Sequence, residues 1–149
     1  MHDDGGVTSD EQAIATLLHT YAERLDAGDL DGVAALFAEA TWRTPARPTP
    51  LSGTAAVRRA YDGVILYDGQ PSTKHVITNV VVTIAADRTT ASARSYFTVL
   101  QARPDFPLQP IICGRYHDAF VRDDAGWRFA DRLILSDLIG DLRRHLRTP

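Results

Sequence analysis

The chain has 149 residues, of which 16 are Lys or Arg and 19 are Asp or Glu, so its formal net charge is −3. Hydrophobic residues make up 44% and charged residues 23%, which argues against an intrinsically disordered chain and is typical of a globular domain. The length is sufficient for one hydrophobic core. We expect residues 1–8 to form a flexible tail and residues 9–149 to form a single domain.

Features that the sequence lacks exclude several classes of protein. No apolar run approaches the ~20 residues of a membrane span, and residues 1–6 lack the apolar core of a signal peptide. We therefore expect a cytoplasmic protein with no membrane partner. The basic residues are scattered and outnumbered by carboxylates, so we expect no nucleic-acid partner. The single cysteine, Cys113, excludes an intramolecular disulfide framework and any multi-cysteine metal site.

The N-terminal part of the chain predicts helices. Ser9 and Gln12 have the spacing of a capping box, and apolar residues then recur with helical spacing over residues 9–27. Gly28 is typical of the position just after a helix, and Asp29 is a good cap for a second helix.

The rest of the chain predicts one more helix and then a sheet. Three prolines exclude a regular helix from residues 42–50, whereas residues 54–65 are expected to be helical. From residue 74 the apolar period changes to two, which predicts four strands over residues 74–85, 91–102, 111–122 and 127–136. Residues 137–146 are expected to form a short helix. Helices followed by strands indicate an α+β fold, a twisted antiparallel sheet with helices on one side.

The strand predicted at residues 74–85 has apolar residues on both faces. Strict alternation places Val76, Val80, Val82 and Ile84 on one face, and His75, Ile77, Asn79 and Val81 on the other. A half-exposed strand normally alternates apolar and polar residues. We therefore expect a curved sheet whose concave side wraps helices or a ligand, and whose convex side meets another subunit in a homo-oligomer.

Two polar residues stand out as candidates for chemistry. Asp26 lies at the C-terminal end of the first helix, where the helix dipole disfavours a carboxylate. It is therefore either a solvated residue at a helix end or a residue with a cationic or hydrogen-bonding partner. His75 begins a strand, where it is either a hydrogen-bonded core residue or a general base.

Further candidates are an arginine and several aromatic residues. Arg132 shares a strand face with Ala130 and Ile134, so its guanidinium must reach solvent, pair with a carboxylate or contact a ligand. Aromatic residues on separate elements would suit the pocket of an apolar, ring-bearing ligand; they include Tyr21, Trp42, Tyr61, Tyr67, Tyr96 and Tyr116. No two histidines have the spacing of a metal site, and no nucleotide-binding or serine-hydrolase motif is present, so we expect no metal and no cofactor.

Five segments, in this order and spacing, resemble the SnoaL-like branch of the nuclear-transport-factor-2-like (NTF2-like) superfamily. They are residues 21–29 (YAERLDAGD), 36–39 (LFAE), 74–79 (KHVITN), 114–118 (GRYHD) and 126–129 (GWRF), the last leading to Arg132. The chain looks most like the family's enzymes scytalone dehydratase, bile acid 7-alpha-dehydratase and the dehydrochlorinase that acts on lindane. The resemblance implies a cone-shaped, curved antiparallel sheet with the N-terminal helices on its concave face, enclosing an apolar pocket.

The same resemblance implies an activity and roles for particular residues. His75 matches the family's catalytic histidine and Asp26 its partner carboxylate, Tyr21 and Arg132 match pocket positions, and Trp42 matches a pocket tryptophan if one residue is deleted before it. The first hypothesis is a cofactor-independent lyase that eliminates water or halide from an apolar cyclic molecule, such as a polyketide or steroid-like compound. Alternatives are an isomerase or cyclase, a non-catalytic ligand-binding protein, and a structural oligomer with an occluded cavity. Similarity to the dehydratases favours a trimer, with a dimer as the alternative.

Overall fold

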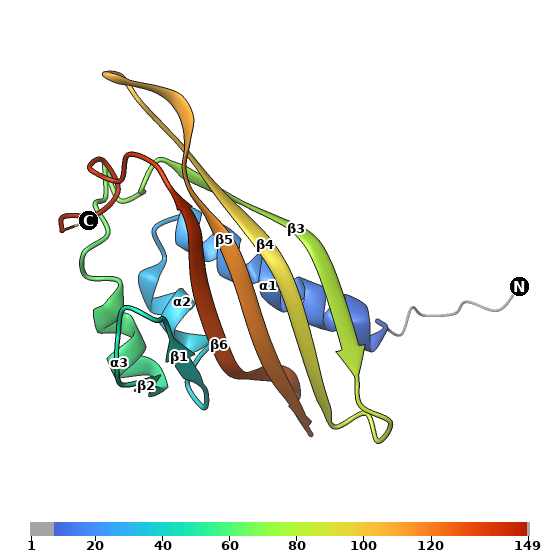
Figure 1. Cartoon of the computed structure of the whole chain (residues 1–149). Helices are drawn as coiled ribbons and strands as arrows, with labels where there is room; N and C mark the ends of the chain where they lie inside the picture. Colours follow the sequence, from blue (N-terminus) through green and yellow to red (C-terminus); the bar gives the residue numbers. More distant parts are fainter. Residues whose placement is uncertain (1–7, 149) are drawn as a thin grey trace, which may run out of the picture.

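The computed structural model describes residues 8–148, so of the tail expected over residues 1–8 only Thr8 lies within the described part. The N-terminal helices are α1 (Asp10–Asp26), α2 (Leu30–Ala35) and α3 (Gly53–Ala60). The strands are β1 (Thr41–Arg43), β2 (Leu51–Ser52), β3 (Thr73–Ile84), β4 (Thr90–Arg103), β5 (Phe106–Asp123) and β6 (Gly126–Ile139). They form one curved sheet with the order β2-β1-β6-β5-β4-β3, and the helices lie on one side of it (Figure 1). The predicted α+β class is confirmed.

Helix α1 is fixed to the sheet at both ends. The Ser9 hydroxyl accepts a hydrogen bond from the backbone N–H of Gln12 at 3.1 Å, as the capping-box spacing predicts. Asp10 accepts hydrogen bonds from the indole N–H of Trp127 at 3.0 Å and from the guanidinium of Arg88 at 2.7 Å. Asp26 anchors the other end of the helix to β3. These contacts hold α1 along the inner face of the sheet (Figure 1).

The segments that the sequence analysis left irregular contain two short strands. β1 pairs in parallel with β6, with Trp42 beside Arg132, and antiparallel with β2. The sheet is therefore not wholly antiparallel. α3 ends at Ala60, earlier than the predicted residue 65, and a turn follows it.

The helix predicted over residues 137–146 is wrong. β6 continues to Ile139 because Leu138 and Ile139 pair with Cys113 and Ile112 of β5, within the part of that strand that the sequence predicted. Residues 140–148 then form turns and loop. Ladder hydrogen bonds to a long neighbouring strand outweigh the weak local preference of this segment for a helix.

A β-bulge in β3 overturns the predicted division of its faces. Asn79 has a backbone φ of +53°, and the register with β4 shifts between Thr78 and Val81. The extra residue reverses the alternation, so His75 and Ile77 share the inner face with Val80, Val82 and Ile84. Val76 and Val81 lie on the outer face, 39% and 44% exposed. The apparent two-faced apolar pattern therefore arises largely from the bulge.

The core lies between the helices and the concave face of the sheet. Its centre is a group of aromatic rings in contact: Tyr21, Phe37, Phe97, Tyr116, Phe120 and Phe129. Within residues 8–148, no helix is both long enough and apolar enough to cross a membrane.

The loop after α1 requires a glycine, and this gives a first prediction. Gly28 has φ +79°, and a Cβ there would lie 1.9 Å from the carbonyl oxygen of Gly69. Gly28→Ala is expected to destabilise the fold by more than about 1 kcal/mol, lowering Tm by at least about 3 °C. Thermal unfolding followed by circular dichroism measures this. Gly63→Ala is the matched control, because a Cβ at Gly63 meets nothing within 4 Å; equal Tm values for the two variants would contradict the argument.

Candidate functional site

Asp26 and His75 are in direct contact on the inner side of β3. The Nδ1 atom of His75 lies 2.6 Å from Oδ1 of Asp26, and the backbone N–H of His75 donates to Oδ2 at 2.7 Å. The Thr73 hydroxyl donates to Oδ1 at 2.8 Å. The side chains of His75 and Asp26 are only 5% and 10% exposed. The sequence left open whether Asp26 is solvated or has a hydrogen-bonding partner, and in the structure it has such partners.

These hydrogen bonds determine the charge state of Asp26. Burial acts to raise the pKa of the Asp26 carboxyl, but the hydrogen bond and charge of the His75 ring, the His75 backbone N–H and the Thr73 hydroxyl outweigh it. The pKa of Asp26 therefore lies below its ordinary value, and the group is a carboxylate near neutral pH. A carboxylate accepts a hydrogen bond from Nδ1–H, so in the uncharged form of the imidazole the proton is held on Nδ1 and Nε2 carries the lone pair.

Tyr21 extends this pair toward the centre of the core. Its ring meets the His75 ring edge-on, with centroids 6.5 Å apart. Its hydroxyl lies 2.6 Å from the Tyr61 hydroxyl, which also accepts a hydrogen bond from the indole N–H of Trp42 at 3.1 Å. Burial, followed by the nearby Tyr21 hydroxyl, raises the pKa of Tyr61 well above its ordinary value, so Tyr61 is uncharged. Tyr21, Tyr61 and Trp42 thus form a continuous polar chain inside an aromatic core.

Arg132 lies on the other side of Tyr21. Its guanidinium stands 4.3 Å from the centroid of the Tyr21 ring and 3.7 Å from that of Tyr116. Nε and Nη2 donate to the two carboxylate oxygens of Asp118 at 2.8 and 3.0 Å, and both side chains are fully buried. The charge and hydrogen bonds of Asp118 outweigh burial and raise the pKa of Arg132, so it stays protonated. Its third nitrogen, Nη1, is buried and has no hydrogen-bond partner among the described residues.

The sheet register explains how these residues meet. Asp118 of β5 pairs with Arg132 of β6, and Trp42 of β1 lies on the other flank of Arg132. Side chains that are paired across neighbouring strands point to the same face. The structure therefore brings together Asp26, His75, Tyr21, Tyr61, Trp42, Tyr116 and Arg132 on one side of the sheet.

Two of the aromatic residues predicted to bind substrate lie elsewhere. Tyr96 is 51% exposed on the outer face of β4, because its neighbour Phe97 takes the inner position. Tyr67 donates its hydroxyl to the carbonyl oxygen of Arg144 at 2.6 Å, and its ring packs beneath Arg103. Tyr67 therefore contacts the C-terminal segment instead of the group around Tyr21.

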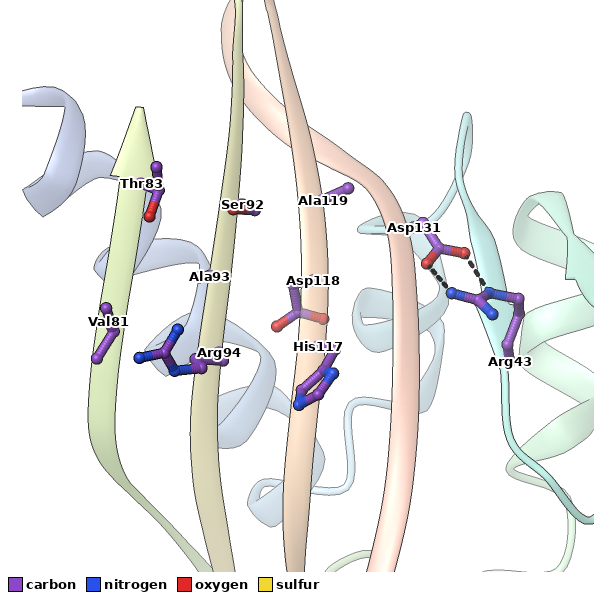
Figure 2. Close-up of a pocket in the computed structure, with 10 residues that line it drawn as sticks. All are labelled: Arg43, Val81, Thr83, Ser92, Ala93, Arg94, His117, Asp118, Ala119 and Asp131. Carbon is purple, nitrogen blue, oxygen red and sulfur yellow. Dashed lines mark hydrogen bonds and ion pairs between the residues drawn. The ribbon is translucent and has the colours of Figure 1, made fainter. Parts of the chain in front are cut away.

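Five hollows on the surface of the described residues lie apart from the group around Tyr21. They have volumes of about 300 to 430 Å³, and none is lined by Asp26, His75, Tyr21 or Arg132. The one of about 430 Å³ lies on the outer face of the sheet, where Arg94 and His117 are paired and Asp131 binds Arg43 at one edge (Figure 2). An inner pocket lined by the predicted residues therefore stays a prediction.

The sequence analysis missed several polar groups on the inner side. Ser95 Oγ, Gln101 Oε1 and His145 Nδ1 are buried without a hydrogen-bond partner in the described part of the chain, as is Arg132 Nη1. His145 is only 7% exposed and lies in the segment for which the sequence predicted a short helix. Among residues 8–148, no three His, Cys, Asp or Glu side chains are grouped to hold a metal ion.

The buried ion pair gives a second prediction. Asp118→Asn leaves the Arg132 charge without its counter-ion in the core, so the free energy of unfolding is expected to fall by about 3 kcal/mol. Asp137→Asn is the matched control, because Asp137 pairs with Arg115 across the same two strands but on the outer face, where both side chains are about 40% exposed. That change is expected to cost less than about 1 kcal/mol. Urea unfolding measures both, and similar small losses would show that the inner pair is not stabilising.

Comparison with known proteins places this arrangement in a family. A family model described as the SnoaL-like domain matches residues 7–133. An NTF2-like protein with a cystatin-like fold from Novosphingobium aromaticivorans is 21% identical over 85% of this chain and 81% of its own, with a TM-score of 0.71.

Two other structures from the same organism carry the names of enzymes. A protein provisionally named an aromatic ring hydroxylase is 26% identical over 91% of this chain and 95% of its own, with a TM-score of 0.69. A protein provisionally named scytalone dehydratase is 21% identical over 87% of this chain and 85% of its own, with a TM-score of 0.67. Because the family model spans most of the chain and these structures share its fold, the chain belongs to the SnoaL-like family and has the NTF2-like fold.

Proposed function

We propose that the protein is a cofactor-independent lyase that eliminates water, or a halide, from an apolar cyclic molecule such as a polyketide or steroid-like compound. The observation that carries the proposal is the hydrogen bond between His75 Nδ1 and Asp26, with Tyr21 and Arg132 on the same inner face. The two enzyme names among the similar structures denote different reactions. The proposal therefore rests on the chemistry of these side chains.

His75 is suited to remove a proton from carbon. With Nδ1–H held by Asp26, the Nε2 lone pair is the base, and the buried carboxylate stabilises the imidazolium that forms. The proton removed lies on a ring carbon next to a carbonyl, where the resulting negative charge moves onto oxygen. The bond from the adjacent carbon to the leaving hydroxyl then breaks and its electron pair stays with the oxygen, which takes the proton back from the His75 imidazolium. A C=C bond and water are formed, and His75 is again a base.

The oxygen atoms of such a substrate need hydrogen-bond donors. The unpartnered Nη1 of Arg132 is a charged donor, and the Tyr21 hydroxyl is a neutral one. In a buried site, donors fixed in advance stabilise developing negative charge more strongly than water does. We assign Tyr21 and Arg132 this role, with Trp42, Tyr61 and Tyr116 contacting the faces of the ring.

Two alternatives use the same side chains. An isomerase or cyclase begins with the same proton removal but loses no leaving group. A ligand-binding protein uses Tyr21 and Arg132 only to hold the molecule, and the Asp26–His75 contact then serves solely to join α1 to β3. Catalysed proton exchange at carbon would distinguish an enzyme from a binding protein. Catalysed loss of water would distinguish the lyase from the isomerase or cyclase.

The third prediction tests the base. 1-Tetralone has an acidic C–H next to its carbonyl and no leaving group, whereas 3-hydroxy-1-tetralone becomes 1-naphthol on losing water. The protein is expected to catalyse deuterium exchange into the first compound, measured by NMR, and dehydration of the second, measured by absorbance. His75→Ala is expected to abolish both, and Asp26→Asn to slow both by about 10²-fold or more, because the ring loses its orientation and correct tautomer.

The matched control is His117→Ala, which removes an imidazole from the outer face of β5. It is expected to keep wild-type rates, and circular dichroism checks that every variant is folded. Turnover of an accepted substrate by His75→Ala at the wild-type rate would contradict the mechanism. Exchange without dehydration would favour the isomerase or cyclase, and tight binding without either reaction would favour a binding protein.

The outer face of the sheet supports a proposal about assembly. Val76, Val81, Tyr96 and Leu138 are exposed there, between 39% and 69%. Apolar side chains grouped on a sheet face commonly become buried between subunits. We propose a homo-oligomer that uses this face, a trimer in preference to a dimer.

The fourth prediction follows from this face. Light scattering at micromolar concentration is expected to give a mass two or three times the 16.4 kDa of one chain. Tyr96→Glu is expected to shift the protein toward the monomer, because it places a charge in the contact. Leu66→Glu is the control, since Leu66 is an exposed apolar residue away from the sheet. A wild-type monomer would contradict the proposal.

A further inference from the structure

The C-terminal segment, residues 140–147, folds back against the loop that follows α3. The backbone N–H of Ile65 donates to the carbonyl oxygen of His145 at 2.8 Å, and that of Arg147 donates to Gly63 at 2.9 Å. The carbonyl oxygen of Arg144 accepts hydrogen bonds from the Tyr67 hydroxyl at 2.6 Å and from the Gln101 amide at 3.0 Å. These contacts fix the backbone on both sides of His145.

Gln101 connects this segment to the Asp26–His75 pair. It lies opposite Thr73 in the β3–β4 ladder, and Thr73 donates its hydroxyl to Asp26. Paired residues point to the same face of a sheet, so Gln101 and Thr73 both face the interior. Gln101 is 1% exposed. Its amide nitrogen donates hydrogen bonds to the carbonyl oxygens of Pro71 and Arg144. Its oxygen Oε1 has no partner among the described residues.

His145 directly follows Arg144, whose carbonyl oxygen accepts a hydrogen bond from Gln101, so these two buried residues lie at the same contact. Burial lowers the pKa of His145 to about 4, with a further lowering by the charge of His75 and an opposing effect of Asp26. The imidazole is therefore uncharged near neutral pH. Its Nδ1 atom is buried without a partner in the described part of the chain. Gln101 Oε1 and His145 Nδ1 thus both lack a partner, and the Gln101 amide binds the residue that precedes His145.

Unsatisfied buried polar atoms are rare in native proteins, because each costs the free energy of its lost hydration. We propose that His145, with Gln101, forms a polar subsite beside the Asp26–His75 pair that binds a hydroxyl group of a ring-bearing ligand. A hydroxyl both donates and accepts hydrogen bonds, which matches the Gln101 oxygen and an uncharged imidazole. The inference rests on the proposed binding of a cyclic compound. It adds a residue that lies beyond the part of the chain matched by the family model.

The experiment compares two probes that differ by one hydroxyl, 1-naphthol and naphthalene. Their affinities are measured from Trp42 and Trp127 fluorescence in the wild type and in His145→Phe, which keeps a buried ring but removes both nitrogens. 1-Naphthol is expected to bind about tenfold more weakly to the variant, while naphthalene affinity is unchanged. His145→Asn, which restores an uncharged donor and acceptor, is expected to recover part of the lost affinity.

The control is His19→Phe, the same substitution at an exposed position of α1, which is expected to leave both affinities unchanged. An equal loss for both probes in His145→Phe would show that His145 only supports packing, and no loss for either would show that it does not contact the hydroxyl; each result overturns the inference. Failure of the wild type to bind either probe would overturn the proposed function, and the subsite with it. Circular dichroism confirms that the variants are folded.

Discussion

The carboxylate of Asp26 is the contact on which the arrangement of helix and sheet depends. It ends α1, where the helix dipole opposes a negative charge, and it is nearly buried, so both effects disfavour it. Three hydrogen bonds from Thr73 and His75 offset that cost and fix the end of α1 on β3. Only one of the three comes from the imidazole. The helix position is therefore set largely by Thr73 and the His75 backbone, and the His75 ring is oriented as a consequence.

The interior beneath α1 contains several buried polar side chains. A fully buried ion pair, Arg132 with Asp118, lies against the rings of Tyr21 and Tyr116. Well-packed apolar residues in place of a buried ion pair are often as stable or more so. Stability alone therefore does not account for this pair, nor for the unpartnered nitrogen that Arg132 keeps. A site that binds oxygen atoms of a ligand accounts for both.

Features that depend on residues close together in the sequence could be predicted, whereas features that depend on contacts between distant segments could not. The Ser9 cap, the Asp29 cap and the end of α1 depend on neighbouring residues, and each was predicted. Asp26 was singled out because a carboxylate at the C-terminal end of a helix conflicts with the helix dipole, and the motif resemblance paired it with His75. The partner of Arg132 was not found, because Asp118 meets it only through the register of β5 and β6. The bulge at Asn79 and the burial of His145 likewise depend on pairing between distant segments.

Access to the inner face is the remaining physical constraint on any ligand. None of the five hollows described above is lined by Asp26 or His75, and aromatic rings pack around Tyr21. α1 is joined to the sheet by hydrogen bonds that Asp10 and Asp26 accept, so separating the helix from the sheet breaks these bonds. The C-terminal segment is held by backbone hydrogen bonds to the α3 loop, by the Tyr67 hydroxyl and the Gln101 amide on the carbonyl oxygen of Arg144, and by the exposed ion pair of Arg144 with Asp105. Opening of a segment becomes less costly as fewer such contacts are broken. A ligand that enters past residues 140–147 must therefore displace buried hydrogen bonds as well as the exposed contact of Arg144.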